Sequence, residues 1–157
     1  MNELIPEFND SLIIDSADLV GDYLELGIDS VLDNEIAKEI PVLKSLISVG
    51  KITRSIRERN YMKNLVIFLN ELNSGDIDIK KLKKHQEELK NNAREAEKEL
   101  GRILIILDQT IDNSKSFILG RLYKSYINQL IDWDLFLEFI EITNRLFVLD
   151  IKLLNMI

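Results

Sequence analysis

The fold of this chain is decided by residues 39–72, which read EIPVLKSLISVGKITRSIRERNYMKNLVIFLNEL. Pro41 suits the first turn of a helix, because its missing N–H would have no partner there in any case. After it, mostly apolar residues recur at spacings of four and three, which places them on one face of a helix. These residues are Val42, Leu46, Val49, Thr53 and Ile56. The stretch therefore predicts a helix that begins near Pro41.

A second apolar set begins after Asn60 and consists of Tyr61, Leu65, Phe68, Leu69 and Leu72. At 3.6 residues per turn, its face is rotated by roughly 100° from the first one. A single straight helix would have to pack against two different partners. We therefore predict a kink near Arg59 and Asn60 that separates two central helices, together spanning about residues 41–73.

Three arginines, Arg54, Arg57 and Arg59, lie at this joint with only one acid, Glu58, among them. The simpler interpretation is that they pair with acidic residues elsewhere in the same domain. The alternative is a binding site for an anion or a protein partner. These arginines are therefore candidate partner-binding residues.

The composition favours one folded, helical domain. The chain has 157 residues, of which 46% are hydrophobic and 30% charged, and this length is typical of a single domain with a substantial core. Six glycines and two prolines are too few for most all-β folds. With no cysteine, disulfides and thiolate metal sites are excluded. No signal peptide or transmembrane segment is evident, so we expect a cytoplasmic protein.

The charge is distributed unevenly along the chain. The net charge is −7, and residues 1–37 contain ten acids and no lysine or arginine. The remaining 120 residues hold 17 acids and 20 bases, so they are slightly basic. This pattern argues against general binding of nucleic acid.

The acidic segment predicts a helix over about residues 10–33, capped by Asn9 or Asp10. Five carboxylates share one face of that helix: Asp15, Asp18, Asp22, Glu25 and Asp29. Like charges at these spacings destabilise a helix by roughly 0.2–0.5 kcal/mol per pair. The ridge is either a solvated face, a partner for basic residues of the same chain, or a docking surface for a basic partner.

The rest of the chain predicts further helices. A turn at residues 73–76 precedes a charged helix over about residues 78–111, which Asn91 and Asn92 can interrupt. Two C-terminal helices follow, over about residues 113–130 and 133–155. The predicted fold is all-α, a single bundle of five to seven helices.

The last predicted helix carries two adjacent apolar stripes. The main stripe has heptad spacing and consists of Leu135, Phe139, Ile142, Leu146, Leu149, Leu153 and Met156. The second stripe comprises Phe136, Ile140, Phe147, Ile151 and Leu154. A helix in a monomeric bundle needs an apolar arc of only about 100°. We therefore predict a homo-oligomer, with self-association through Leu135, Phe139, Leu146, Leu149 and Leu153.

No motif for catalysis, cofactor binding or metal binding is present. The only histidine, His85, lies in a charged run and is predicted to be solvated. Residues 108–119 have acidic spacing like that of a calcium loop, but Asn113 replaces the turn glycine and Leu119 replaces the bidentate glutamate. With one histidine and no cysteine, the usual nucleophile–base pairs are not expected. The sequence predicts a protein that is not an enzyme.

Several short motifs resemble those of a group of small, uncharacterised helical proteins of bacteria and their prophages. They are Pro41-Val42-Leu43, the segment 55–59 (SIRER), and the segment 119–123 (LGRLY). The resemblance spans roughly residues 40–150. It implies a prokaryotic or phage origin and a role in phage–host conflict, and it implies no catalytic residues.

We thus expect a non-enzymatic interaction protein that acts in phage–bacterium conflict through self-assembly and through a protein partner, for which a phage protein is one candidate. In one variant of this hypothesis, the helix that begins at Pro41 and the C-terminal helix contact a membrane after a trigger. The alternative is an acidic decoy, whose ridge blocks a basic nucleic-acid-binding groove on a target enzyme.

Overall fold

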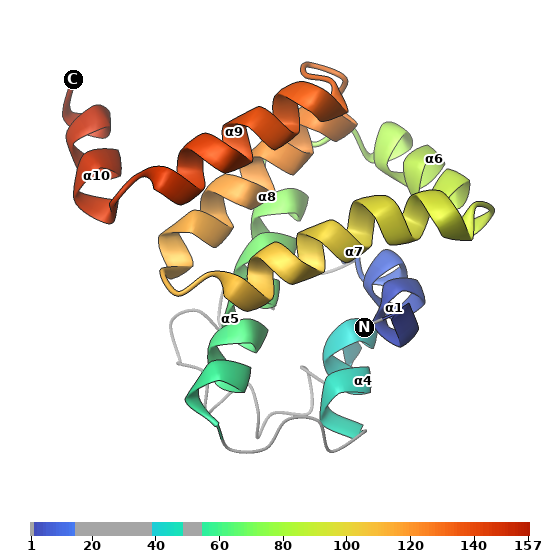
Figure 1. The fold of residues 1–157 in the computed structure, drawn as a ribbon. Coiled ribbons are helices and arrows are strands. Elements are labelled where there is room, and N and C mark those ends of the chain that lie inside the picture. The colour runs from blue at the N-terminus through green and yellow to red at the C-terminus, as the bar shows by residue number, and fades with distance from the viewer. Residues whose placement is uncertain (1, 15–38, 49–54) are drawn as a thin grey trace.

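The computed structural model describes residues 2–14, 39–48 and 55–157, and this part of the chain is all-α with no strand (Figure 1). A short 3₁₀ turn, η1 (Asn2–Leu4), precedes eight α-helices in the described ranges. They are α1 (Ile5–Asp10), α4 (Pro41–Ser48), α5 (Ile56–Asn73), α6 (Ile79–Lys90), α7 (Ala93–Gln109), α8 (Asn113–Ile127), α9 (Trp133–Arg145) and α10 (Val148–Met156). The predicted fold class is confirmed. The count exceeds five to seven partly because two predicted helices are each divided.

The charged segment forms two helices, as the two asparagines allowed. Asp78 caps α6 by accepting from the backbone N–H of Lys80 and Lys81, at 3.0 and 3.2 Å. Asn92 caps α7 in the same way, with its side chain accepting from Glu95 N at 3.2 Å. A side chain that satisfies the free N–H groups of a first turn starts a new helix. The chain therefore turns between α6 and α7.

The kink predicted at Arg59 and Asn60 is wrong in position. Helix α5 runs without interruption from Ile56 to Asn73. Its start is fixed by Ser55, whose Oγ accepts from Glu58 N at 3.2 Å and donates to the Glu58 carboxylate at 2.8 Å. Because Ser55 satisfies an N–H of the first turn, α5 begins afresh at Ile56. Val42 and Leu46 of the first apolar set lie in α4 and Ile56 lies in α5, whereas Val49 and Thr53 lie outside the described residues.

A short N-terminal helix that was not predicted, α1, precedes the segment of the predicted acidic helix. Helix α1 ends at Asp10, and the next described residues, 11–14, are not helical. Asn9 does not cap a helix at residues 11–14, because these are not helical. Instead its side chain donates to Gln86 O at 3.0 Å, and its carbonyl accepts from Gln86 Nε2 at 2.7 Å. These bonds hold α1 against α6. Residues 15–33 of the predicted acidic helix lie outside the described residues.

The core is built around α5, which packs mainly against α8 and α7. Phe68 of α5 contacts Phe8 and Tyr123, with ring centroids 5.7 and 5.6 Å apart. The crossing of α5 and α8 is close at Gly120, where an added Cβ would lie 2.9 Å from Glu71 Cβ and 3.1 Å from the Phe68 carbonyl. Only glycine leaves room for this approach of the two backbones.

The two predicted stripes of α9 are divided between the core and the surface. Phe136 is fully buried, whereas Leu135 and Phe139 of the main predicted stripe are each 37% exposed. This division is set by aromatic packing: Phe136 stacks on Trp133 at 4.8 Å and lies edge-on to Tyr123 at 6.1 Å. The second stripe therefore supplies the core contacts of α9, and the main stripe faces outward.

The predicted C-terminal helix is also broken at Leu146 and Phe147. Helix α9 ends at Arg145, and α10 starts afresh at Val148 with Phe147 N donating to Asp150 Oδ2 at 3.0 Å. Both linking residues have extended backbones, with ψ of 140° and 155°. The heptad spacing therefore does not run along one continuous helix.

Candidate functional site

Helix α10 projects away from the rest of the bundle (Figure 1). None of the principal helix–helix contacts of the described chain involves it. Four of its apolar side chains are exposed: Leu149 (66%), Leu153, Leu154 and Met156 (82%). Asp150 and Lys152 are its only charged residues. A mostly apolar helix that is exposed to solvent is the most unusual feature of the described structure.

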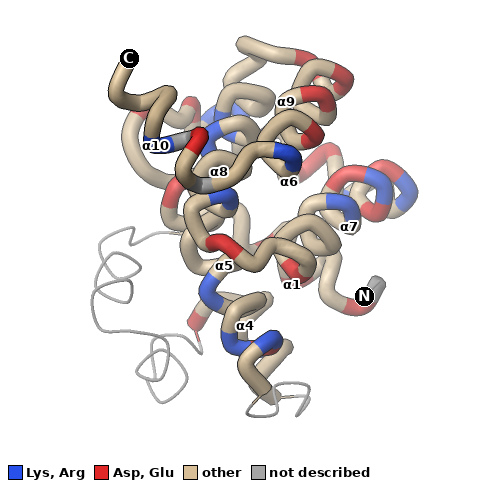
Figure 2. The backbone as a smooth tube through the Cα atoms, turned by 60° about the vertical axis from the view of Figure 1, so that its left-hand side comes forward, with Lys and Arg blue, Asp and Glu red and all other residues tan. Residues whose placement is uncertain are grey.

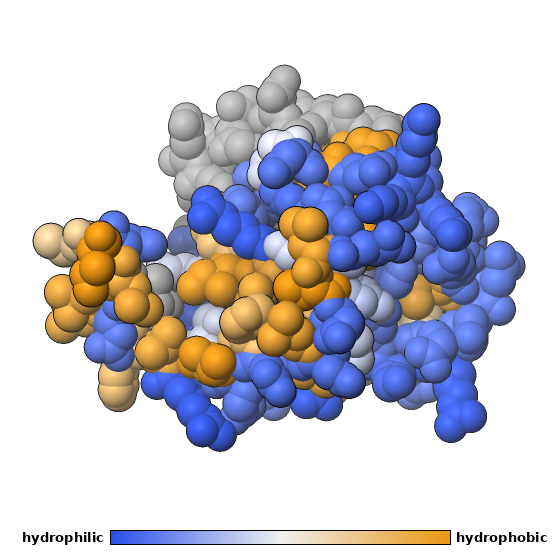
Figure 3. Space-filling model, turned by 90° about the horizontal axis from the view of Figure 1, so that it is seen from above, coloured by the Kyte–Doolittle hydropathy of each residue, from blue (hydrophilic) through white to orange (hydrophobic). Residues whose placement is uncertain are grey.

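The outward face of α9 adds to this apolar surface. Leu135, Phe139 and Ile142 recur at helical spacing and are all exposed. Figure 3 shows hydrophobic side chains gathered on the face of the bundle that includes α9 and on the projecting C-terminal end. Exposed apolar patches of this kind commonly mark interaction sites.

The five residues predicted to mediate self-association occupy these two helices and their joint. Leu135 and Phe139 lie on the outward face of α9, and Leu149 and Leu153 are exposed on α10. Leu146 lies at the joint and is half-buried. We call these four exposed residues, together with Ile142, the apolar C-terminal surface.

A groove runs between α7 and α9 on the other side of α9. It consists of two cavities of about 420 and 520 Å³, which share Ile106, Gln109 and Asn144 and are therefore continuous. Four residues of α9 line it. Three of them, Leu137, Glu141 and Asn144, lie roughly 180° around the helix from the outward apolar face, and the fourth is Ile140. The groove and the apolar C-terminal surface are thus separate features.

The groove has an apolar floor and charged rims. Ile105 and Ile106 of α7 and Leu137 and Ile140 of α9 supply the apolar part. The rim on α7 carries Lys98, Arg102 and Glu97, and the rim on α9 carries Glu141. Figure 2 shows charges of both signs along α7. One oxygen of Glu141 accepts from Arg145 at 3.0 Å.

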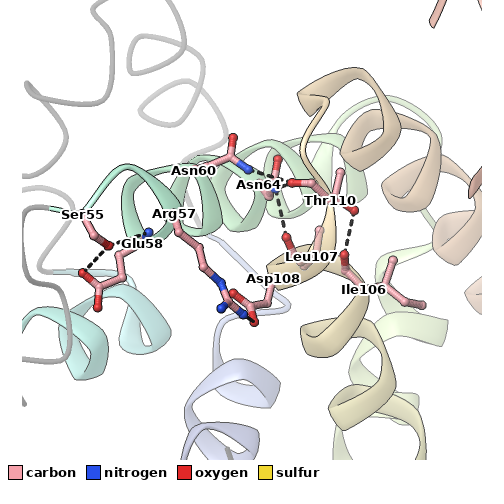
Figure 4. Close-up of polar contacts among 9 residues, drawn as sticks. All are labelled: Ser55, Arg57, Glu58, Asn60, Asn64, Ile106, Leu107, Asp108 and Thr110. Carbon is pink, nitrogen blue, oxygen red and sulfur yellow. Dashed lines mark hydrogen bonds and ion pairs between the residues drawn. The ribbon is translucent and has the colours of Figure 1, made fainter. Parts of the chain in front are cut away.

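The arginine joint is partly an internal ion pair. Arg57 donates to Asp108 Oδ2 at 2.6 Å, across from α5 to α7 (Figure 4). The hydrogen bond to Asp108 and its negative charge raise the pKa of Arg57 above its ordinary value. Arg59 is half-buried in α5, and Arg54 lies outside the described residues. For Arg57, the structure therefore shows the internal pairing and not an open site.

Beside this pair, a buried amide closes the C-terminal end of α7. Asn64 Nδ2 donates to the carbonyls of Leu107 and Thr110, at 2.9 and 2.7 Å (Figure 4). Asn60 donates to the same Thr110 carbonyl at 2.7 Å. The last carbonyls of a helix lack intrahelical partners, and these amides supply them. This role is not visible in the sequence, because an asparagine within an apolar helix gives no sign of its partner.

A second buried polar cluster involves His85. This histidine was predicted to be solvated, but its side chain is largely buried against other helices. Its Nε2 lies 2.6 Å from Glu99 Oε1, and Tyr123 donates to the same oxygen at 2.6 Å. Tyr126 donates to Glu99 Oε2 at 3.3 Å. Burial and the Glu99 charge raise the pKa of Tyr123 well above its ordinary value. The cluster lines neither cavity and joins α6, α7 and α8, so its role is to hold these helices together.

The acidic ridge cannot be placed on this framework. Asp15, Asp18, Asp22, Glu25 and Asp29 all lie outside the described residues. The membrane variant is affected in another way, because α4 uses its apolar face in the core: Leu43 is fully buried and Ile47 is half-buried. An α4 helix that bound a membrane would first have to leave that packing.

The described residues contain neither a metal-binding cluster nor a membrane-spanning helix. They contain no group of three or more histidine, cysteine or acidic side chains placed to hold a metal ion. None of the helices in the described ranges has the length and apolar character needed to cross a membrane.

Comparisons with known proteins found no counterpart. No protein-family model matches the chain, and no curated protein or solved structure matches it.

Proposed function

We propose that this protein is a non-enzymatic interaction protein that binds another copy of itself through the apolar C-terminal surface. The observation that carries the proposal is α10, which has nine residues and exposes Leu149, Leu153 and Leu154. Isolated helices shorter than about 12–15 residues are marginal in water. Such a helix is best stabilised by packing against a partner surface.

The available apolar area fits this role. Burying one leucine or phenylalanine side chain contributes roughly 1.5–3 kcal/mol, whereas association costs about 4–15 kcal/mol in lost freedom of motion. Several side chains are therefore needed, and α9 and α10 together expose more than five. A symmetric pair of copies would use each set twice.

Replacing both Leu149 and Leu153 by aspartate is expected to convert the oligomer to a monomer. The substitution places charges in the proposed interface, where they would be desolvated without partners. Both residues are exposed in the single chain, so the bundle should stay folded, and any loss of helix content measured by circular dichroism should not exceed the nine residues of α10. Sedimentation velocity at tens of micromolar protein measures the change in mass.

Ile79→Asp provides a matched control, because Ile79 is an exposed apolar residue in the first turn of α6, where an acidic residue is tolerated. This variant should keep the mass of the wild-type protein. A wild-type chain that sediments as a monomer at high micromolar concentration would refute the proposal.

The biological setting that we propose is conflict between a bacterium and its phages, which rests on the resemblance of residues 40–150. A bacterial host that expresses the wild-type chain should then show a changed plating efficiency for at least some phages. Cells expressing the Leu149→Asp/Leu153→Asp variant at equal level should not. Identical plating across a broad phage panel would argue against this setting while leaving self-association untouched.

A further inference from the structure

We propose that the groove between α7 and α9 is the receptor for α10 of a second copy, which lies in it parallel to α7 and α9. This inference rests on the proposed self-association and specifies its geometry. Each copy would donate its α10 and receive that of its partner, in a reciprocal exchange.

The dimensions of the groove match those of α10. Along α7 the groove extends from Glu97 to Gln109, which corresponds to about 18 Å at 1.5 Å per residue. The nine residues of α10 span about 13 Å by the same rise. The helix therefore fits within the length of the groove.

The apolar chemistry also matches. Leu149, Leu153 and Met156 recur at spacings of four and three, so they share one face of α10, and all three are exposed. The groove offers Ile105, which is 42% exposed, and the partly buried Ile106. Docking would cover both sets at once.

Charge fixes the direction of the docked helix. Asp150 and Lys152 are 200° apart on a helical wheel, so they flank the face of Leu149, Leu153 and Met156 on opposite sides. Viewed from the N-terminus of α10 with that face downward, Asp150 is on the left and Lys152 is on the right. These are the only two charges that α10 brings to the groove.

The groove presents the better match of signs in one orientation. The α7 rim is net positive, with Lys98 and Arg102 against Glu97, and the α9 rim carries Glu141, which also accepts from Arg145. Helices α7 and α9 run in the same direction, and their C-terminal ends meet in the smaller cavity (Figure 1). Viewed along them with the groove facing upward, α7 is on the left and α9 is on the right. A parallel α10 places Asp150 beside Lys98 and Arg102 and Lys152 beside Glu141, whereas an antiparallel one brings like charges together.

The preferred parallel direction can be reached by α10 of a partner but not by α10 of the same chain. Leu146 and Phe147 line the C-terminal end of the groove, so the chain's own α10 could enter only by doubling back, antiparallel to α9. That orientation is the one with like charges adjacent. The connection is also only two residues long, and short hinges favour exchange of an element between copies.

A cysteine cross-link tests the docking directly, because the native chain has no cysteine. An affinity-tagged Ile105→Cys protein is mixed with untagged Leu153→Cys protein, allowed to exchange, and oxidised gently. The expected result is a disulfide-linked pair that contains one chain of each kind. Lys83→Cys, exposed on α6, replaces Ile105→Cys in the matched control and should give no such pair.

The orientation is tested by charge reversal. Lys98→Glu with Arg102→Glu should raise the dimer dissociation constant by about tenfold, the effect of two rim ion pairs. The rescue is made on the other rim, because Asp150 also caps α10: Glu141→Lys should weaken the dimer, and adding Lys152→Glu should recover most of that loss, which a merely structural role of Glu141 would not predict. A Glu141→Lys/Lys152→Glu variant as weak as Glu141→Lys would overturn the parallel orientation.

The remaining outcomes separate this inference from the proposed function. If the protein is a dimer but Leu153→Cys cross-links only to itself, α10 packs against its counterpart, and the inference fails while self-association holds. If the wild-type chain is monomeric and an Ile105→Cys/Leu153→Cys double variant forms only an internal disulfide, α10 closes on its own groove. That result would overturn both proposals.

Discussion

Replacing Glu99 by alanine is expected to lower the free energy of unfolding by about 3–5 kcal/mol, the range for removing one partner of a buried ionic network. The change leaves His85 and the hydroxyls of Tyr123 and Tyr126 without their shared acceptor. Tyr123 is fully buried, so water cannot replace the lost bond without opening the core. Urea titration monitored by circular dichroism measures the effect.

Glu99→Gln is the informative control, because the amide oxygen still accepts hydrogen bonds while the charge is lost. It should be clearly more stable than Glu99→Ala. His85→Ala should have a smaller effect than Glu99→Ala, because it removes only one of the three donors. If Glu99→Ala unfolds at the wild-type urea concentration, the cluster does not hold α6, α7 and α8 together.

The helices were predictable from the sequence, but this cluster was not. Apolar spacing and capping residues such as Asp78 and Asn92 act locally, so they are visible in the chain itself. The partner of His85 is on another helix, 14 positions away, within a run of charged residues that looks uniformly solvated. Which of those charges turns inward depends on how α6 and α7 pack together.

The groove between α7 and α9 was hidden for a similar reason. Its lining residues come from separate helices and include Gly101, Arg102 and Glu141, which show no shared pattern in the sequence. The apolar C-terminal surface, by contrast, was predicted from the excess width of its apolar arc. A helix whose apolar arc is wider than packing in its own domain requires is predicted to have an interface. The sequence does not show the shape of the partner surface.

Helix α9 illustrates the limit of periodicity most clearly. Its two apolar stripes are adjacent and similarly hydrophobic, so spacing alone cannot say which one faces the core. The heptad stripe that contains Phe139 was predicted to mediate self-association. The aromatic cluster around Tyr126 and Trp133 takes Phe136 of the other stripe into the core and leaves Phe139 exposed. Tertiary packing of large rings outweighs a regular pattern of smaller side chains.

A pair of alanine substitutions on α9 tests which stripe faces the core. Phe136→Ala is expected to lower the free energy of unfolding by about 3–5 kcal/mol, the range for removing a buried phenylalanine. Phe139→Ala should lower it by less than about 1 kcal/mol, as expected for a largely surface position. Both are measured by urea titration at low protein concentration, because self-association would add its own stabilisation.

The two variants should show the opposite order when self-association is measured. Phe139→Ala removes an apolar side chain from the outward face of α9 and should weaken the dimer by up to the roughly 1.5–3 kcal/mol of one buried phenylalanine if that face lies in the interface. Docking of α10 in the groove alone leaves the dissociation constant unchanged, because Phe139 does not line the groove. Phe136 is inside the fold, so its loss should affect dimerisation only through global stability. If Phe139→Ala destabilised the monomer as much as Phe136→Ala, the heptad stripe would face the core after all, and α9 would be rotated about its axis from the orientation described here.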